Sequence, residues 1–514
     1  MKLTIYLQAL FWLSFSCNPP EEYNLHVTRS LQNGPPVPDL DWKPIDLSLI
    51  YLNDLPSSLS SEFFPRAKSW YNKVLKVINT GPIKISVPKC AGLEVPDKYF
   101  NTSLNTNLLI LITYSESKDT NAWAVPCEIN EDSYMRPVLG RIHLEGDFSS
   151  LTWEQKFALT VHQIAHILAY DFHLAPYFLG EIGERNGLNE VIGYTTRRDT
   201  QITYIKTPMV LKHSKIEFQC NNLYGLDTEQ GLVETGSSIH WDKRIMNNDF
   251  MVAGWDTYYI VYSKISLGLF EDSGWYQVDY SYGEHPTWGS QKGCEFLIDQ
   301  CITDKQAKFS EFCNISTSIT QCDHTHTYKG TCTLTDLKSS IPSQYQYFDN
   351  PYTGGNDKHA DYCPYIKPLP TGSCQDIGEK SSSTNEDDYG ESVCENCKCL
   401  EGTYINQLSK KAIHLHAGCH KVTCEGNVAV IHIGDEVVFC DPSGGKVAVR
   451  GYDGYVFCPN SNILCKDLPC PFACHGRGKC VEGQCECESG SFGTYCEDFG
   501  LLLSFIPIFL ILTN

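Results

Sequence analysis

The sequence predicts an α+β protein whose first part mixes strands and helices and whose second part is mostly β and rich in disulfides. In the first part the apolar residues follow strand, helix, strand and strand patterns in turn, over residues 43–54, 60–78, 107–115 and 136–146. An amphipathic helix then begins after Thr152. This order of elements is typical of a mixed α/β unit, and a chain of 514 residues is long enough for several domains.

Cysteine usage predicts the second part and its cellular compartment. Of the 25 cysteines, 21 fall between residues 294 and 496, among short strand patterns such as residues 427–440. Such a density is typical of a secreted chain that is held together by disulfides. Two N-glycosylation sequons, at Asn101 and Asn314, fit the same secretory route.

Both ends of the chain are apolar. Residues 1–17 carry one lysine and then an apolar run, which indicates a secretory signal peptide, and residues 18–42 form a short leader. As a helix, the tail of residues 499–514 would be about 21 Å long, shorter than a bilayer core of about 30 Å. The tail therefore predicts a signal exchanged for a glycolipid (GPI) anchor or, alternatively, a short membrane segment. Either way we expect a membrane-attached protein of the cell surface.

The charge balance argues against one class of partner. The formal net charge is −21 and no run of lysine and arginine stands out, so we expect no nucleic-acid-binding surface. We expect partners among extracellular or surface proteins and peptides instead.

The helix that begins after Thr152 carries two histidines one turn apart. Thr152 and Gln155 form a capping-box pattern, which marks the start of the helix. Within "HQIAHILA", His162 and His166 are four residues apart and therefore point the same way. Such a pair supplies two of the three nitrogen ligands that catalytic zinc needs. The alternative is a coincidence of two buried core histidines.

A third histidine stands in "SSIHWDKRIMNNDFM", where His240 precedes Met251 by eleven residues. This arrangement resembles the leishmanolysin family of zinc metallopeptidases, metzincins in which a helical HExxHxxG is followed, after a long insertion, by "HW-acidic-KR" and a methionine turn. Further segments look like the family, and the resemblance covers roughly residues 43–466. It implies one Zn²⁺ ion per chain, bound by His162, His166 and His240 above a hydrophobic floor formed by Met251.

The resemblance also divides the chain. It implies a metzincin-like catalytic domain with the zinc helix, made of an N-terminal and a central subdomain. A disulfide-rich, mostly β C-terminal domain, an EGF-like module and the tail follow. The expected boundaries are residues 43–170, 171–300, 301–466, 467–497 and 499–514.

The last six cysteines follow the spacing Cys-x3-Cys-x5-Cys-x4-Cys-x-Cys-x8-Cys, which resembles an EGF-like domain. A chain this short lacks a core and depends on its disulfides. We expect such a module to act as a spacer or an adhesion element. The resemblance implies three disulfides, Cys470–Cys480, Cys474–Cys485 and Cys487–Cys496.

Two residues of the zinc helix depart from the family pattern. Ala169 stands where the family has a glycine; because alanine disfavours the left-handed conformation, we expect the helix to run on or to exit differently, at a modest geometric cost. Gln163 stands at the position of the usual catalytic glutamate, which takes a proton from the zinc-bound water. An amide cannot hold that proton, so we expect zinc binding with impaired proteolysis. Asp171 and Glu181 follow the helix, but neither has a spacing that predicts reach to the metal.

Other histidine and cysteine groups have simpler interpretations. Cys394, Cys397 and Cys399 have a spacing that resembles a zinc site, but in a secreted chain disulfides are expected. Five histidines lie in disulfide-rich segments and are expected at the surface: His324, His326, His414, His416 and His420.

Three functions remain open from the sequence. The preferred hypothesis is a zinc-bound, catalytically impaired surface protein that binds proteins or peptides through the former substrate cleft, for example in adhesion. The second is an active zinc endopeptidase that cleaves extracellular proteins, with water activated by zinc alone or by a displaced carboxylate. The third is a structural coat protein without metal. Only the first two predict about one chelatable zinc per chain.

Overall fold

The structure, a computed structural model, describes residues 25–28, 41–180, 185–197, 200–229, 238–314, 319–375, 386–394, 396–426, 428–465, 470–481 and 484–499. The predicted signal peptide, most of the predicted leader and nearly all of the predicted tail lie outside these residues. Among the described residues, no helix is both long enough and apolar enough to cross a membrane.

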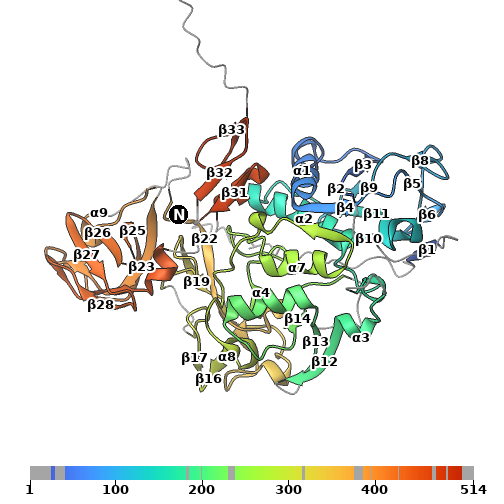
Figure 1. Cartoon of the computed structure of the whole chain (residues 1–514). Coiled ribbons are helices and arrows are strands. Elements are labelled where there is room, and N and C mark those ends of the chain that lie inside the picture. The colour runs from blue at the N-terminus through green and yellow to red at the C-terminus, as the bar shows by residue number, and fades with distance from the viewer. Residues whose placement is uncertain are drawn as a thin grey trace, which may run out of the picture.

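The first part is built on a five-stranded mixed sheet (Figure 1). Its strands lie in the order β1–β10–β11–β9–β3; β10 and β11 pair antiparallel, and the other pairs are parallel. Helices α1 (Phe64–Val74) and α2 (Trp153–Leu168) pack together beside it. The strands are β1 (His26–Thr28), β3 (Leu47–Tyr51), β9 (Leu108–Ser115), β10 (Asn121–Asn130) and β11 (Arg136–Glu145).

Strand alternation gives this sheet two apolar faces. Ile110 and Ile112 of β9 belong to the core shared with α1 and α2, whereas Leu109 and Leu111 belong to a second core on the other face. Residues 83–104 cover that second face, and the Cys90–Cys127 disulfide joins them to β10. The covering segment contains two short pairs, β5 (Ile83–Lys84) with β8 (Ser103–Leu104) and β6 (Lys89–Cys90) with β7 (Leu93–Glu94).

Helix α2 approaches the sheet closely because a glycine of β11 lies beneath it. A Cβ added at Gly140 would lie 2.4 Å from Cγ2 of Ile167, which real side chains do not tolerate. Ile167 follows His166 directly on α2. The glycine therefore sets the distance between the sheet and the helix that carries two of the histidines.

Two predicted elements of the first part differ from the structure. The helical pattern over residues 60–78 covers a π-helical turn (Leu59–Phe63), then α1, and finally strand β4 (Leu75–Ile78). These last four residues are strand because they pair with β15 (Tyr276–Val278) and β2 (Trp42–Pro44). The predicted strand over residues 43–54 likewise divides between β2 and β3, which lie in different sheets.

Residues 171–300 form a three-stranded sheet and several short helices, which together carry His240 and Met251. A disulfide between Cys220 and Cys294 joins the end of α4 to α8. The main elements are α3 (Leu188–Val191), β12 (Ile192–Arg197), β13 (Thr200–Ile205), α4 (Pro208–Phe218), β14 (Leu226–Asp227), α6 (Lys243–Met246), α7 (Lys264–Asp272) and α8 (Cys294–Ile298).

The second part is mostly β, and the prediction of a mixed α/β chain with a disulfide-rich C-terminal half is confirmed. Small sheets come first, formed by β16 (Ile302–Thr303), β17 (Gln306–Ala307), β18 (Gln321–Cys322), β19 (Tyr328–Cys332), β20 (Leu334–Asp336), β21 (Thr353–Gly355) and β22 (Ile366–Ser373). A six-stranded antiparallel sheet follows, in the order β27–β26–β25–β23–β30–β28. Its strands are β23 (Cys397–Gly402), β25 (His416–Glu425), β26 (Val428–Ile433), β27 (Glu436–Cys440), β28 (Gly445–Ala448) and β30 (Tyr455–Cys458).

Twelve disulfides include every cysteine in the described part of the chain. In the second part they join segments that share little apolar core, as expected for a chain stabilised by cross-links. Between residues 301 and 465 the pairs are Cys301–Cys363, Cys313–Cys332, Cys322–Cys399, Cys374–Cys419, Cys394–Cys397, Cys424–Cys465 and Cys440–Cys458.

The last module packs against the first part of the chain (Figure 1). Its hairpin, β31 (Gly478–Val481) with β32 (Gln484–Cys487), is closed by the three disulfides that the EGF-like resemblance implies. Arg66 of α1 donates a hydrogen bond to the carbonyl of His475 at 3.1 Å, and Lys73 donates one to the carbonyl of Gly476 at 3.1 Å. The imidazole of His475 lies 4.4 Å from the ring of Trp153, the first residue of α2. The module therefore contacts the helix that carries two of the histidines.

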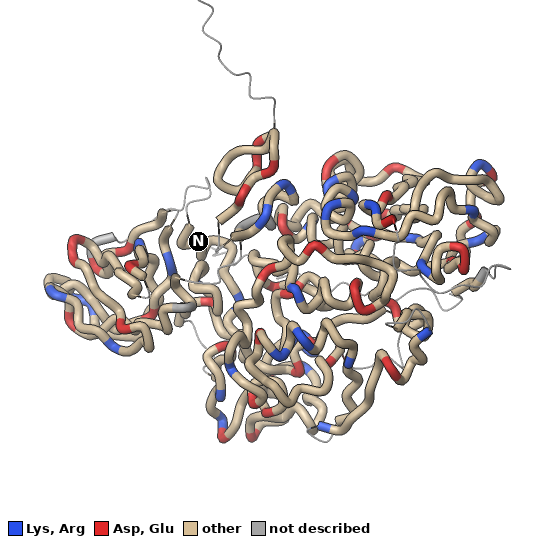
Figure 2. Tube along the Cα trace, in the orientation of Figure 1, with Lys and Arg blue, Asp and Glu red and all other residues tan. Residues whose placement is uncertain are grey.

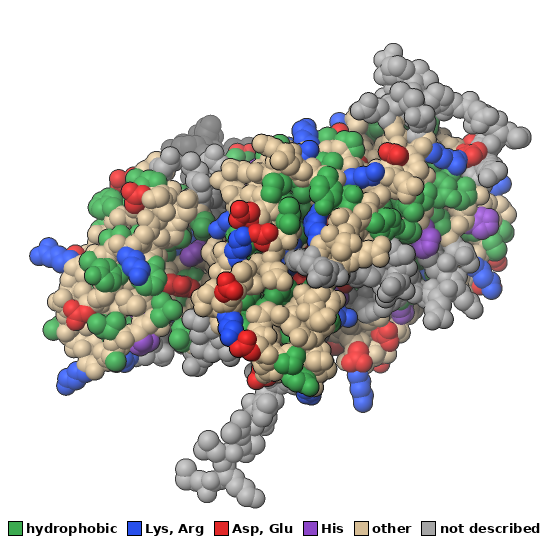
Figure 3. Space-filling view, turned by 90° about the horizontal axis from the view of Figure 1, so that it is seen from below, with side chains coloured by type: hydrophobic (Ala, Val, Ile, Leu, Met, Phe, Trp, Pro, Cys, Tyr) green, Lys and Arg blue, Asp and Glu red, His purple; other side chains and the backbone are tan. Residues whose placement is uncertain are grey.

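Charges of both signs are spread over the surface. Acidic and basic residues occur along the whole described trace (Figure 2). On the face shown in Figure 3, they lie interspersed with polar and hydrophobic side chains. The net charge of −21 is thus distributed over many elements.

Replacement of Gly140 tests how strongly α2 depends on its close contact with the sheet. We expect Gly140→Ala to push Ile167 outward and to lower the free energy of unfolding by about 1–3 kcal/mol, as overpacked cores do. Gly187→Ala is the control, because a Cβ added there meets no atom within 4 Å. Thermal unfolding followed by circular dichroism compares the two variants, and equal midpoints would contradict the expectation.

Candidate metal centre

The local sequence fixes helix α2 at both ends. The predicted capping box is present: Thr152 Oγ1 accepts from the Gln155 amide at 3.3 Å, and Gln155 Oε1 accepts from the Thr152 amide at 3.1 Å. The helix ends at Leu168, and Ala169 adopts φ −158°, outside the left-handed region. The chain thus exits differently from the glycine pattern, as expected. Ala169 does not adopt the left-handed conformation that alanine disfavours, so this exit avoids the cost of that conformation.

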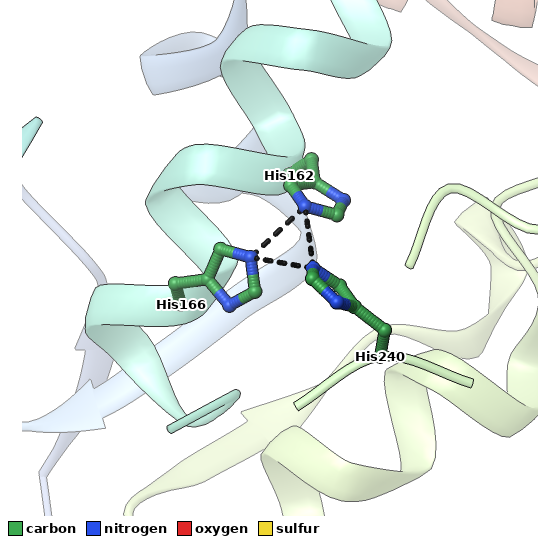
Figure 4. A group of neighbouring side chains, drawn as sticks. All are labelled: His162, His166 and His240. Carbon is green, nitrogen blue, oxygen red and sulfur yellow. Dashed lines mark hydrogen bonds between the residues drawn. The ribbon is translucent and has the colours of Figure 1, made fainter. Parts of the chain in front are cut away.

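Three histidines from two distant segments meet beside α2 (Figure 4). His162 and His166 come from consecutive turns of α2, and His240 comes from the loop that precedes α6. The Nε2 atoms of His162 and His166 lie 2.9 Å apart, and Nε2 of His240 lies 3.2 Å from each of them. The structure therefore brings together the three residues that the sequence predicts as ligands.

The hydrogen bonds on the outer side of each ring decide where its proton lies. Carbonyl and carboxylate oxygens only accept, so a ring nitrogen that contacts one of them must carry the hydrogen. Each Nε2 then presents a lone pair to the other two. The three Nδ1 contacts are His162 with the Phe250 carbonyl at 2.7 Å, His166 with the Tyr170 carbonyl at 2.8 Å and His240 with Glu229 Oε2 at 2.9 Å.

Three lone pairs that face one another in a buried place need a positive charge between them. Burial, with the electrostatic effect of His240, lowers the pKa of His162 to about 3, and burial lowers the pKa of His166 in the same direction. At neutral pH, therefore, neither of these two rings carries a second proton. A tetrahedral zinc-type ion bound at about 2.0–2.1 Å would hold the nitrogens about 3.3 Å apart. The observed spacing of 2.9–3.2 Å fits such an ion.

The turn at Phe250 and Met251 ties the two histidine-bearing segments together. Met251 is fully buried, and its carbonyl accepts a hydrogen bond from the Trp241 amide at 3.0 Å. The carbonyl of Phe250, the residue before it, accepts the hydrogen bond from Nδ1 of His162. One turn thus holds His162 of α2 and the residue that follows His240. The role of Met251 as a floor beneath the metal stays a prediction.

Gln163 lies between the two histidines of α2 and is fully buried. Its amide does not ionise, so the position next to the ligands carries no proton acceptor of the carboxylate type. Asp171, a candidate substitute, is buried and accepts a hydrogen bond from the amide of His173 at 2.8 Å. The other candidate, Glu181, lies outside the described residues.

Two residues of the site were missed in the sequence. Glu229 bridges two histidines, with Oε2 on His240 at 2.9 Å and Oε1 hydrogen-bonded to Nδ1 of His359. Burial alone would raise the pKa of Glu229, but the hydrogen bonds and charges of both histidines bring it well below its ordinary value. The carboxylate is therefore ionised. An acidic residue eleven positions before His240 was the only available signal, and nothing in the sequence indicated His359.

The expected surface position of five histidines is partly wrong. His414 is exposed, and His324 and His326 are half-buried. His416 and His420 are buried, because β25 runs through the six-stranded sheet, and Nε2 of His420 hydrogen-bonds to the hydroxyl of Tyr404 at 2.5 Å. None of the five belongs to a group that could hold a metal among the described residues.

The cysteine groups are structural. Cys394 is bonded to Cys397, and Cys399 to Cys322, as the disulfide interpretation expects. In the described ranges, two further groups of residues have metal-binding atoms close together, and both consist mainly of cysteines of the EGF-like module; one of these groups also includes Glu284. Their cysteines are already paired in disulfides.

The two sequons differ in exposure. Asn101 is exposed. Asn314 is half-buried, and its Nδ2 donates to the carbonyl of Lys305 at 2.9 Å. Glycosylation of either residue stays a prediction.

A mixed α/β domain with three converging histidine nitrogens, two on one helix and one in a later loop, has the arrangement of a three-histidine site that could hold one metal ion. Comparison with protein families is in agreement. The family model for leishmanolysin matches residues 56–470, and that for the EGF-like domain matches residues 470–496. The chain therefore belongs to the leishmanolysin family, which confirms the resemblance read from the sequence.

Individual relatives show the extent of this similarity. The chain is 26% identical to a leishmanolysin homolog of Crithidia fasciculata over 357 residues, which cover 68% of this chain and 53% of the relative. It is 25% identical to leishmanolysin of Leishmania donovani, over 73% of this chain and 64% of the relative. It is 26% identical to a leishmanolysin-like peptidase of Drosophila melanogaster, over 71% of this chain and 63% of the relative. The chain thus spans between half and two thirds of the length of these relatives.

The lowered pKa of His162 predicts how the metal-free protein responds to acid. An unfolded histidine takes up a proton near pH 6.5, whereas folded His162 does so only near pH 3, so the unfolded state binds more protons between these values. Stability should therefore fall as the pH decreases from 6.5, by up to about 1.4 kcal/mol per pH unit for His162 alone. Urea unfolding with a chelator present, at pH 7 and pH 5, measures this. His162→Gln should give a shallower dependence, and an unchanged one would contradict the expectation.

Proposed function

We propose that this chain is a surface member of the leishmanolysin family that binds one Zn²⁺ ion and has lost efficient proteolysis. The observation that carries the proposal is the triangle of Nε2 atoms from His162, His166 and His240, with the amide of Gln163 on the same helix. The set of nitrogen ligands is complete, while the neighbouring group is not a carboxylate. Three neutral imidazoles are a set that zinc favours.

The chemistry left to this site follows from its side chains. When bound, zinc would supply a Lewis acid that polarises a peptide carbonyl. Gln163 can accept or donate a hydrogen bond, but it cannot take up a proton or return one to a leaving amine. Such transfer contributes typically about 10²- to 10⁴-fold to an enzyme rate. We therefore infer that a peptide can be held here and is cleaved slowly at most.

A site of this kind supports a binding function. We infer that the chain binds extracellular or surface proteins or peptides at the region that receives substrate in the family, for example in adhesion. The disulfides of the described residues support an oxidising, extracellular location. Membrane attachment through residues 499–514, by a glycolipid anchor or a short membrane segment, belongs to the same proposal.

Zinc content is the first test of the proposal. We expect the purified chain to carry about one zinc ion, as a three-histidine site does, and to lose it to a strong chelator. His240→Ala should lose most of the metal, because two helical histidines alone leave the ion half-coordinated. Elemental analysis measures the content. An intact fold without zinc, and with no stabilisation by added zinc, would support a structural protein instead.

The second test restores the missing carboxylate. We expect Gln163→Glu to raise cleavage of a denatured protein substrate by about 10²- to 10⁴-fold over the wild type. Gln155→Glu is the matched control: it makes the same chemical change on α2 but in the capping box, which accepts glutamate. Its activity should equal that of the wild type.

The same assay separates the alternatives. Substantial cleavage by the wild-type chain, abolished by chelator and by His162→Ala, would show an active endopeptidase and overturn the proposal. If zinc binds but neither the wild type nor Gln163→Glu cleaves, more of the site than its base has changed.

A further inference from the structure

We propose that the Cys-rich part of the chain is a component of the metal centre, because a short segment of it fixes the third ligand. This segment, here called the brace, consists of Asp357, His359 and Asp361. The inference rests on the zinc binding proposed above. It assigns to His359 the role of a positioning residue, which acts on the metal through Glu229 and His240.

The first contact of the brace leads to the metal ligand itself. Glu229 accepts hydrogen bonds from Nδ1 of His359 and from Nδ1 of His240, one on each carboxylate oxygen. The amide of Glu229 also donates to the carbonyl of His240 at 2.9 Å. One residue therefore holds the ligand by its ring and by its backbone. The side chains of His359, Glu229 and His240 are at most 22% exposed, so water competes weakly for these bonds.

The second contact lies three residues after the ligand. Asp357 accepts a hydrogen bond from Nζ of Lys243 at 2.7 Å, and Asp256 accepts one from the same ammonium at 3.0 Å. The side chains of Lys243 and Asp357 are 4% and 6% exposed. Leaving one member of a buried ion pair without its partner typically destabilises a protein by about 3–5 kcal/mol. The pair therefore resists separation of the brace from the segment of His240.

The third contact uses the next residue of the same segment. Oδ2 of Asp361 lies 3.6 Å from Nε of Arg244, which is itself fully buried. Arg244 also donates to two carbonyls of α8, at 2.9 and 2.7 Å. Shortly after α8, Cys301 is bonded to Cys363, two residues beyond the brace. Both segments are thus attached to the region of α8. Arg244 attaches the segment of His240 by hydrogen bonds, and the Cys301–Cys363 disulfide attaches the brace covalently.

The backbone of the brace agrees with this role. Asp357 caps the turn Lys358–Ala360 by accepting from the His359 amide at 2.9 Å. Asp361 and Tyr362 then both lie in the left-handed region, with φ 54° and 55°. Consecutive left-handed residues other than glycine are strained and persist where surrounding contacts determine them. Here the turn places three alternate side chains against Lys243, Glu229 and Arg244.

The third ligand needs such support more than the others. His162 and His166 are fixed relative to one another by their helix, whereas His240 is 74 residues from His166 along the chain. Partners that orient a ligand histidine typically change metal affinity by about 10- to 100-fold when they are removed. Loss of His359 should therefore appear in the affinity for zinc.

The test measures zinc affinity of the full chain by competition with a chromophoric chelator. We expect His359→Leu, which removes the donor to Glu229, to weaken zinc binding by about 10- to 100-fold and to alter the visible absorption of the Co²⁺-substituted protein. His359→Asn keeps an N–H near the position of Nδ1 and should stay close to the wild type. His285→Leu is the matched control, since it breaks another histidine–glutamate contact, with Glu217 at 2.9 Å, and should leave the affinity unchanged.

Each result decides the inference. Equal affinity of the wild type and His359→Leu, or an equal loss in His285→Leu, overturns the brace while zinc binding itself stands. A wild-type chain that binds no zinc overturns the proposed function and the brace together. If His359→Leu does not fold, His359→Phe decides, because it removes the donor to Glu229 and keeps a ring at this position. A weaker affinity of that variant supports the brace, and an unchanged one overturns it.

Discussion

The mutual repulsion of three buried imidazole lone pairs is the constraint on which the rest of the structure depends. Nε2 atoms within 3.2 Å of one another are unfavourable unless a cation joins them, because each Nδ1 already gives its hydrogen to an oxygen. The capped helix α2, the glycine beneath it and the turn at Phe250 hold two of these rings in place. Glu229 holds the third. The fold thus keeps the nitrogens at a distance that suits a metal and not one another.

Gln163 separates two properties that usually occur together. Metal affinity depends on the three imidazoles and on the oxygens that orient them, and all of these are present in the described residues. Proton transfer depends on one ionisable group at a single position, and an amide there removes it without a change of shape. Under the proposed function, this chain keeps a metal in its core and has lost efficient turnover. The EGF-like module contacts Trp153, the first residue of the helix that carries His162 and His166, and Arg66 of the neighbouring helix α1.

The correct predictions of local structure came from short-range sequence patterns, and the wrong ones concern residues whose structure depends on contacts with distant segments. The capping box at Thr152 and the spacing of His162 and His166 lie within a few turns of one helix, so spacing alone was sufficient. The helix predicted over residues 60–78 was too long, since apolar spacing does not record that β4 has partner strands on both sides. His420 was expected at the surface and is buried, because its strand lies inside a sheet whose other strands come from distant segments.

By itself the sequence determined the mixed α/β class, the cross-linked second half, the helical pair of His162 and His166 and the absence of a carboxylate between them, since each depends on residue identity and local spacing. Only the tertiary structure decided that His240 meets this pair and which groups orient the three rings. Glu229 and His359 are 130 residues apart, and Lys243 and Asp357 are 114 apart. Such pairs leave no periodic trace in a single sequence, because their contact is produced by the packing of whole elements and not by the residues between them.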